Sequence, residues 1–312
     1  ATIGPMRTSR RGTATVAAAA VLAVAACGGG DGSGRDGPPP ARAASPEPSA
    51  SASPLPAPNG RLAKDPQGLA GDLNRTHQAI GPAVDAWVRA DPSRTGPPAA
   101  VVPLALRQQR LYRVLARDPG LRKRTLARLS GPVADQTRDN VTAVSKLLDL
   151  TRPVDDLDGF RVQEPEPAGV LLGHFRDAAK RFGVDWRVLA AIMLVETRYG
   201  RVRSPSWAGA QGPMQFLPAT WRRYGLGGDI RDPRDAVMGA ANYLKSSGAP
   251  RDYRRALRAY NPTPLYVDAV LRHTRQMRKD PRAYYAYYNW QVFVVTTRGD
   301  VRLTGPGARR PG

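Results

Sequence analysis

The 312-residue sequence predicts a mainly α-helical protein with a disordered tether before the helices and a small β-hairpin after them. Three observations predict this class. Apolar residues recur at intervals of three and four from about residue 62 onward, which is the spacing of one helix face. Residues 28–60 are dense in Pro, Ser and Gly without apolar periodicity, so they cannot bury enough surface to fold. Residues 284–304 are rich in β-branched and aromatic residues.

The composition excludes two classes of site. A single cysteine rules out an internal disulfide framework and a cysteine-based zinc site. Lys and Arg number 47 against 26 Asp and Glu, a net charge of +21. That excess permits binding to a polyanion, but an Arg-rich composition is also what a GC-rich genome produces on a solvated surface. The charge alone therefore identifies no partner.

The N-terminal segment has the organisation of a signal peptide. Three arginines precede the apolar residues 16–26, a stretch too short to cross a bilayer as a helix. It ends in the letters VAAC at 24–27, which resemble a bacterial lipobox. We expect residues 1–26 to be a lipoprotein signal peptide, Cys27 to be lipidated, and residues 27–60 to be a semi-stiff tether. An ordinary cleaved signal and an uncleaved apolar anchor are the alternatives.

Residues 61–160 are predicted to be a helical accessory domain. Their apolar stripes indicate four helices, the first ending at Asp91-Pro92, the second and third separated at Pro119-Gly120, and the fourth ending near Pro153. The stripe of the first helix comprises Leu69, Leu73, Ile80, Val84, Trp87 and Val88. No motif with a recognised chemistry occurs in this segment, and His77 has no partner residue within a helical turn. Its role is left open.

After a connection at 156–167, two helices are predicted at 168–182 and 186–199. Gly183 ends the first, Asp185 is a suitable N-cap for the second, and Gly200 is its predicted stop. His174, in the stripe of the first helix, is interpreted as a core or boundary residue. The spacing puts Glu196 on the apolar face of the second helix.

Glu196 is a candidate general acid. It is the only glutamate after the connection, and it lies where a carboxylate is costly unless it is paired or lines a cleft. Partial burial raises the pKa of such a group, which suits proton transfer near neutral pH. The alternative is a structural ion pair with Arg198, Arg201 or Arg203.

Four blocks follow in order: ETRYG at 196–200, SWAGAQGPMQF at 206–216, AANYL at 240–244 and AYNP at 259–262, with YV at 266–267. Together they resemble the lytic murein transglycosylases with a lysozyme-like (soluble lytic transglycosylase) domain, most closely the membrane-bound lytic transglycosylase B family. The resemblance covers roughly residues 168–278. It implies a lysozyme-like α-helical catalytic domain, here placed at 161–283.

The resemblance also implies site residues. Glu196 would be the single catalytic acid and base, and a second set would line the saccharide groove: Ser206, Gln215, Tyr243, Tyr260 and Asn261. Hydroxyls, amides and tyrosine rings suit hydrogen bonding to, and stacking on, sugars. Each has an ordinary alternative, because the two tyrosines would also serve as core aromatics and Asn261 as a turn residue.

The family reaction cleaves the MurNAc-β-1,4-GlcNAc bond of peptidoglycan and leaves 1,6-anhydromuramic ends, so the chain is expected to be an enzyme, a glycoside-cleaving lyase. A goose-type-like muramidase on the same fold, and a catalytically idle glycan-binding lipoprotein, are the alternatives. For a hydrolase, the conceivable second carboxylates are Asp229, Asp232 and Asp235.

No metal and no cofactor are expected. Some members of the family carry a calcium loop before the helix that contains the AANYL block, but the connection at 224–233 is too short for twelve residues with spaced oxygen ligands. Asp232-Pro233 instead predicts a helix N-terminus. Residues 284–312 are predicted to be a β-hairpin and tail, with Arg298-Gly299-Asp300 at the turn; its aromatic residues would alternatively extend a glycan platform.

The expected partners are peptidoglycan glycan strands and, through the lipid on Cys27, the outer face of the cytoplasmic membrane, in the cell-wall space. We expect a monomer. Nucleic acid is not expected, because a signal peptide removes the chain from it and no motif that binds DNA or RNA is present. Residues 161–312 contain 26 basic and 12 acidic residues, a charge that favours a wall rich in carboxylates and phosphates.

Overall fold

The structure is a computed structural model, and it describes residues 54–308. The predicted signal peptide, the lipidation site Cys27 and most of the tether lie outside the described residues. None of the helices within 54–308 combines the length and the apolar character needed to cross a membrane.

The first four helices confirm the helical nature of residues 61–160. They are α1 (Pro66–Arg89), α2 (Val101–Arg117), α3 (Pro119–Leu126) and α4 (Gly131–Asp149). The side chains of Asp65 and Asp118 accept hydrogen bonds from backbone N–H groups in the first turns of α1 and α3, and a proline follows each cap. The predicted stripe of α1 is buried except for Val88, which is 42% exposed. Val88 follows the buried Trp87 and points away from the core, so its assignment to the stripe was wrong.

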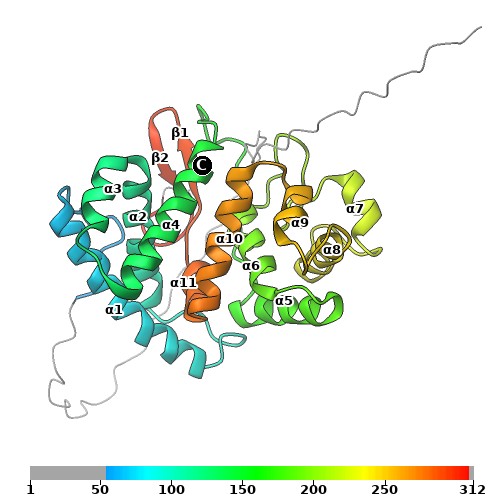
Figure 1. Ribbon diagram of the computed structural model, residues 1–312, viewed down its shortest axis with the longest axis horizontal. Coiled ribbons are helices and arrows are strands. Elements are labelled where there is room, and N and C mark those ends of the chain that lie inside the picture. Colours follow the sequence, from blue (N-terminus) through cyan, green and yellow to red (C-terminus); the bar gives the residue numbers. More distant parts are fainter. Residues whose placement is uncertain (1–53, 309–312) are drawn as a thin grey trace, which may run out of the picture.

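Six helices follow: α5 (Ala168–Phe182), α6 (Trp186–Thr197), α7 (Pro218–Tyr224), α8 (Pro233–Ser246), α9 (Tyr253–Tyr260) and α10 (Pro264–Lys279). Asp185 and Asp232 cap α6 and α8, and Gly183 ends α5 in a left-handed conformation, all as predicted. Figure 1 shows α1–α4 on the left, α7–α9 on the right, and α6 and α10 between them.

Helix α6 ends two residues before its predicted end. Arg198 and Tyr199 both adopt left-handed backbone conformations, with φ of 53° and 61°. The buried Thr197 hydroxyl holds this turn, because it donates to the Pro213 carbonyl at 2.6 Å and accepts from the Gly200 N–H at 2.9 Å. The strain of two left-handed residues is about 1 kcal/mol or more each, and long-range packing of the Tyr199 ring offsets it.

The C-terminal segment is a helix before it is a hairpin. Residues 282–288 form α11 (Arg282–Tyr288), and the hairpin consists of β1 (Phe293–Thr296) and β2 (Gly299–Arg302). The hairpin is confirmed, but its predicted start at residue 284 was wrong. Thr296 pairs with Gly299, so residues 297–298 form the turn and Gly299 already belongs to β2. Tyr284 and its helical neighbours are buried, which excludes an exposed glycan platform there.

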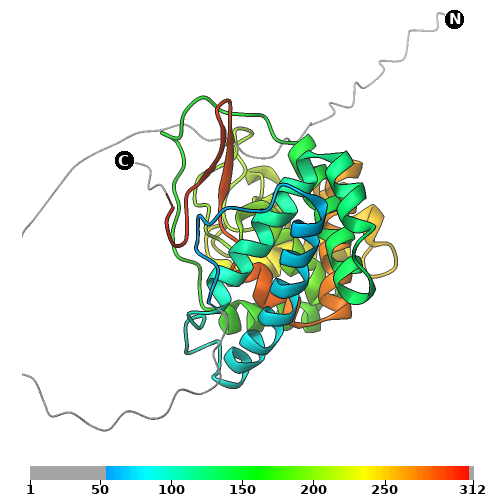
Figure 2. The same cartoon turned by 90° about the vertical axis from the view of Figure 1, so that its left-hand side faces the viewer.

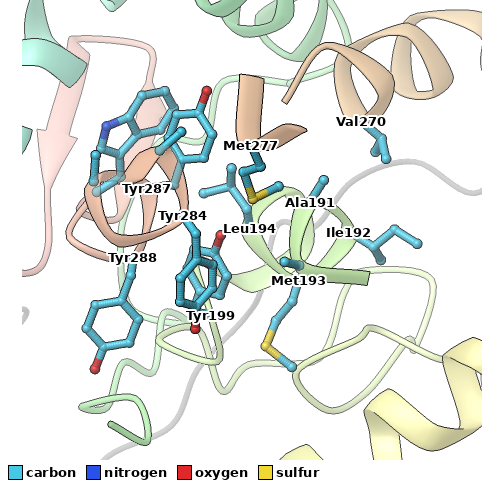
Figure 3. Packing of buried hydrophobic residues seen from close by; sticks show 14 of the residues in the cluster. Ala191, Ile192, Met193, Leu194, Tyr199, Val270, Met277, Tyr284, Tyr287 and Tyr288 are labelled. Carbon is cyan, nitrogen blue, oxygen red and sulfur yellow. The ribbon is translucent and has the colours of Figure 1, made fainter. Parts of the chain in front are cut away.

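The tyrosines of α11 complete an aromatic cluster around the end of α6. The ring of Tyr284 contacts those of Phe175, Trp186 and Tyr199 at centroid distances of 5.6–6.2 Å. Tyr199 also lies against Tyr288, and Figure 3 shows Tyr199 and Tyr284 beside Leu194 of α6. The cluster fixes the turn that follows α6.

One hydrophobic cluster contains residues of α1–α4 and of α5–α11. Helices α4 and α10 pack together, and Asp139 of α4, 2% exposed, accepts hydrogen bonds from Arg272, Arg275 and Gln276 of α10. The two parts therefore share a core, and the division near residue 160 stays a prediction. In Figure 2 the hairpin stands beside the loop after α4, where the Val154 N–H donates to the Val295 carbonyl at 3.0 Å.

Candidate active site

A cavity of about 170 Å³ opens at the C-terminal end of α6. Its lining comes from five places: the end of α4 with the loop after it, the end of α6, the 202–215 loop, the junction of α9 and α10, and β1. Five of the six sequence-predicted catalytic and binding residues line it, namely Glu196, Ser206, Gln215, Tyr260 and Asn261. The fold thus brings together residues that lie up to 65 positions apart in the sequence.

Glu196 lies in the last turn of α6 and is partly buried. Its Oε1 accepts a hydrogen bond of 2.7 Å from the Tyr266 hydroxyl, donated from the first turn of α10. Burial raises the pKa of Glu196 from 4.5 to about 7, and the hydrogen bond from Tyr266 acts in the opposite direction. The carboxyl is therefore protonated in a large fraction of molecules near neutral pH.

The ion-pair alternative for Glu196 is not realised. The guanidinium groups of Arg198 and Arg201 donate to the carbonyls of Leu194 and Tyr288 instead. Among the described residues, the carboxylate of Glu196 has a hydrogen bond from Tyr266 and no ion pair with Arg198, Arg201 or Arg203.

Gln215 lines the cavity and has a buried acceptor without a partner. Its backbone is left-handed, with φ of 50°, and its Nε2 donates to the Gly212 carbonyl at 3.0 Å. Its Oε1 is buried without a hydrogen-bond partner, which is a costly arrangement. Gly212 is required here, because it has φ of 74° and a Cβ would lie 1.8 Å from the Ile230 carbonyl oxygen.

Ser206, Tyr260 and Asn261 line the cavity while making structural hydrogen bonds. Ser206 Oγ accepts from the Ala210 N–H at 3.0 Å, and the Tyr260 hydroxyl donates to the Met214 carbonyl at 2.6 Å. Asn261 Oδ1 accepts from the Thr263 N–H at 3.1 Å, which is the turn role left open by the sequence. These bonds hold the three side chains in one orientation.

Tyr243 lies outside the residues that line the cavity. Its hydroxyl donates to the Ala259 carbonyl at 2.7 Å, and its ring contacts those of Tyr224 and Tyr260 at centroid distances of 4.5 and 5.7 Å. In the structure, Tyr243 therefore supports the cavity wall from behind Tyr260. A direct contact with saccharide stays a prediction.

Glu196 is the only carboxylate among the cavity-lining residues. The three aspartates considered for a hydrolase bond to the backbone around the start of α8: Asp229 accepts from the Arg231 N–H, Asp232 from the Asp235 N–H, and Asp235 from the Asp229 N–H. In the part of the chain that the structure describes, no three His, Cys, Asp or Glu side chains are grouped as a metal site would require.

Sequence reasoning missed two parts of this site. Tyr266 was recognised only as the end of the last sequence block, although its position five residues after Asn261 indicated that it enters the same region. The wall formed by Thr151, Arg152 and Phe293 had no local signal, because the loop after α4 and β1 meet only in the folded chain.

Comparisons with known proteins agree with this geometry. Residues 173–282 match the family model described as Transglycosylase SLT domain. A membrane-bound lytic murein transglycosylase F of Thiobacillus denitrificans is 28% identical over 137 residues, which is 41% of this chain and 29% of that protein. A membrane-bound lytic murein transglycosylase F 1 of Alkalilimnicola ehrlichii is 31% identical over 148 residues, 44% of this chain and 28% of that protein.

The chain spans less than a third of the length of these relatives. No solved structure matches it significantly. The resemblance to lytic transglycosylases is confirmed, and the finer resemblance to the B family stays a prediction.

Proposed function

We propose that this chain is a peptidoglycan lytic transglycosylase, on the premise that its residues 173–282 form a transglycosylase SLT domain. The observation that carries the proposal is the environment of Glu196. It is the one cavity-lining residue with a carboxylate, and its partial burial raises its pKa to about 7. A glycosidase that activates water normally uses two carboxylates. A single carboxyl near half-protonation suits a reaction in which one group acts first as acid and then as base.

In the first step Glu196 acts as the acid. It gives its proton to the oxygen between N-acetylmuramic acid and N-acetylglucosamine, and the bond from that oxygen to C1 of the muramyl sugar breaks. The acetamide oxygen of the same sugar bonds to C1 and stabilises the positive charge that develops. Tyr266, hydrogen-bonded to Oε1, fixes the orientation of the carboxyl and stabilises the carboxylate that this step produces.

In the second step the Glu196 carboxylate acts as the base. It removes the proton of the muramyl C6 hydroxyl, whose oxygen attacks C1 and displaces the acetamide oxygen. The product is a 1,6-anhydromuramic end, no water is consumed, and Glu196 regains its proton. Burial of Glu196 keeps the two protonation states close in free energy near neutral pH, which both steps require.

The remaining cavity residues would bind the glycan. The unpaired Oε1 of Gln215 is an acceptor for an acetamide N–H or a sugar hydroxyl. Ser206 and Asn261 offer further polar atoms, and the Tyr260 ring offers an apolar surface for a sugar face. Tyr243 contributes by supporting Tyr260.

Mass spectrometry of muropeptides released from purified peptidoglycan tests the proposal. The 312-residue chain should release products with anhydromuramyl ends, and Glu196→Gln should release none. Reducing ends would identify a muramidase instead. No release by the wild-type chain would favour a glycan-binding protein and overturn the proposed activity.

The proposed location is outside the cytoplasmic membrane, where peptidoglycan lies, and two relatives named as membrane-bound murein transglycosylases support it. The anchor would be a lipid on Cys27. Metabolic labelling with a fatty acid should mark the wild-type chain and not Cys27→Ser, which should leave the membrane fraction. Equal labelling of both would contradict lipidation at this residue.

A further inference from the structure

The cavity continues from Glu196 to a second wall of different character. This wall consists of the end of α4 with the loop after it, β1 and Arg198, and its lining residues are Leu147, Leu150, Thr151, Arg152, Val154, Arg198, Phe293 and Val294. It is apolar except for Thr151 and the two arginines. Residues from the helical segment 61–160 thus form part of the same cavity as the candidate acid.

Arg198 is a cation without a carboxylate partner. It is partly buried in the turn after α6, and its one hydrogen bond from the guanidinium goes to the Leu194 carbonyl. Burial, and next the charge of Arg113, lower the pKa of Arg198 to about 10, so it remains charged near neutral pH. Arg113 itself pairs with Asp300, with 2.7 Å between Nη2 and Oδ2, and Arg117 shares the same carboxylate. Of Arg113 and Arg198, Arg198 is therefore the one without a carboxylate partner among the described residues.

Arg152 adds a second cation at the rim. Its side chain is exposed, lines the cavity, and takes part in no ion pair or hydrogen bond with the described residues. Neither arginine acts on the pKa of Glu196, which burial and Tyr266 determine. Both arginines line the same cavity as Glu196.

We propose that Arg198 and Arg152 bind a carboxylate of the peptide stem attached to the muramyl sugar whose bond Glu196 cleaves. The inference rests on the proposed function. An uncompensated, partly buried guanidinium is costly until an anion pairs with it, and a carboxylate matches the arginine fork. The apolar residues around the cations would contact the aliphatic parts of the stem.

The chemistry of the substrate selects this ligand. The glycan backbone is uncharged apart from its substituents, so a neutral saccharide leaves both arginines unpaired. The stem starts on the same sugar ring that Glu196 acts on, which matches a cationic wall beside the acid. The segment 61–160, whose role the sequence left open, would then determine which stems the enzyme accepts.

A binding measurement tests the proposal separately from catalysis. Isothermal titration calorimetry would use the 312-residue chain carrying Glu196→Gln, so that no ligand is cleaved. The probes are a purified disaccharide tetrapeptide and the same compound with its carboxyl groups converted to primary amides. We expect the acidic probe to bind about 10-fold more tightly, as for a charge-assisted hydrogen bond.

The variants assign the preference to the cavity. Arg152→Gln should remove part of the preference for the acidic probe, and Arg198→Met should remove most of this preference. Arg89→Gln, at an exposed position at the end of α1, is the control and should retain the full preference. Arg152 is exposed and unbonded, so its variant tests the site even if Arg198→Met does not fold. Equal binding of the two probes, or a preference that survives both substitutions, would overturn the proposal.

The two proposals fail in distinguishable ways. A chain that cleaves peptidoglycan but binds both probes equally would refute only the stem site. A chain that releases no products yet prefers the acidic probe would refute the activity and leave the stem site standing.

Discussion

Glu196 and Tyr266 form the smallest unit on which the proposed chemistry depends. Their 2.7 Å hydrogen bond joins the last turn of α6 to the first turn of α10. The Tyr266 hydroxyl donates to the charged form of the carboxyl and so favours ionisation, while burial opposes it. The balance between the two leaves the pKa near neutrality.

Tyr266→Phe should therefore raise the pKa of Glu196 above its value of about 7. Because cleavage begins with protonated Glu196, activity falls as pH rises through this pKa, and the alkaline limb should move to higher pH. The pH profile of kcat/KM measures the shift. Tyr253→Phe is the control, since Tyr253 lies at the opposite end of α6, against Asp185, and its profile should match the wild type. A limb that stays in place for Tyr266→Phe would contradict the assignment.

Glu196→Gln should stabilise the protein in a pH-dependent way. The pKa is 4.5 ordinarily and about 7 in the folded state, so ionisation favours the unfolded chain as pH rises between these values. The contribution of Glu196 to stability is therefore greatest below pH 4.5, decreases as pH rises toward about 7, and stays reduced above it. Glutamine does not ionise, so its advantage over glutamate should grow by about 2 kcal/mol from about pH 5 to pH 8. Urea denaturation at both pH values measures it, and a difference independent of pH would exclude the raised pKa.

At the scale of elements, the contact between α4 and α10 holds the two parts of the chain together. Asp139, 2% exposed, is the shared acceptor for three donors on α10, two of them arginines. Both helices also contribute to the cavity. The loop after α4 carries Arg152, and the first turn of α10 carries Tyr266.

Asp139→Asn should lower the free energy of unfolding by about 2 kcal/mol, since it removes the buried anion that accepts from Arg272 and Arg275, although Arg272 keeps its pair with Asp268 and Arg275 is 53% exposed. Urea denaturation measures the loss. Asp135→Asn is the matched control on the same helix, where Asp135 pairs with Lys279 and Arg138 and all three side chains are about half exposed. Exposed pairs contribute little. Equal losses in the two variants would mean that burial of Asp139 has no special effect.

At the scale of the whole molecule, charge is distributed unevenly. Residues 161–312 contain 26 basic and 12 acidic residues. Among these, several arginines of α7 and α9, such as Arg222 and Arg254, are exposed and have no carboxylate partner in the described structure. A polymer that carries carboxylates and phosphates would be attracted to such a surface over a distance set by ionic strength.

Binding of the Glu196→Gln chain to purified cell walls should therefore weaken several-fold as salt is raised from roughly 0.05 M to 0.5 M, where the screening length falls to a few ångströms. Co-sedimentation measures the bound fraction. The same titration with chitin, a neutral glycan, should show little dependence on salt. Wall binding that stays constant over this range would rule out electrostatic attraction.

The sequence predicted the features that local physical chemistry determines. Asp185 and Asp232 each set a helix start through one hydrogen bond to a nearby N–H group, and Gly183 ends α5 because its left-handed conformation costs glycine little. The helical spacing that put Glu196 among apolar residues also anticipated its burial. The ordered blocks predicted the family, because each depends on residues close together in the chain.

Tertiary structure alone decided the features that depend on contacts between distant segments. Thr197 bonds to Pro213, and α6 ends early as a result. The tyrosines of α11 are helical because an aromatic cluster surrounds them, although their propensity favours strand. The bond from Tyr266 to Glu196 and the wall that carries Arg152 likewise exist only where separate elements meet. Local sequence determines which conformations a segment prefers, whereas packing determines which of them the folded chain keeps and which side chains share a cavity.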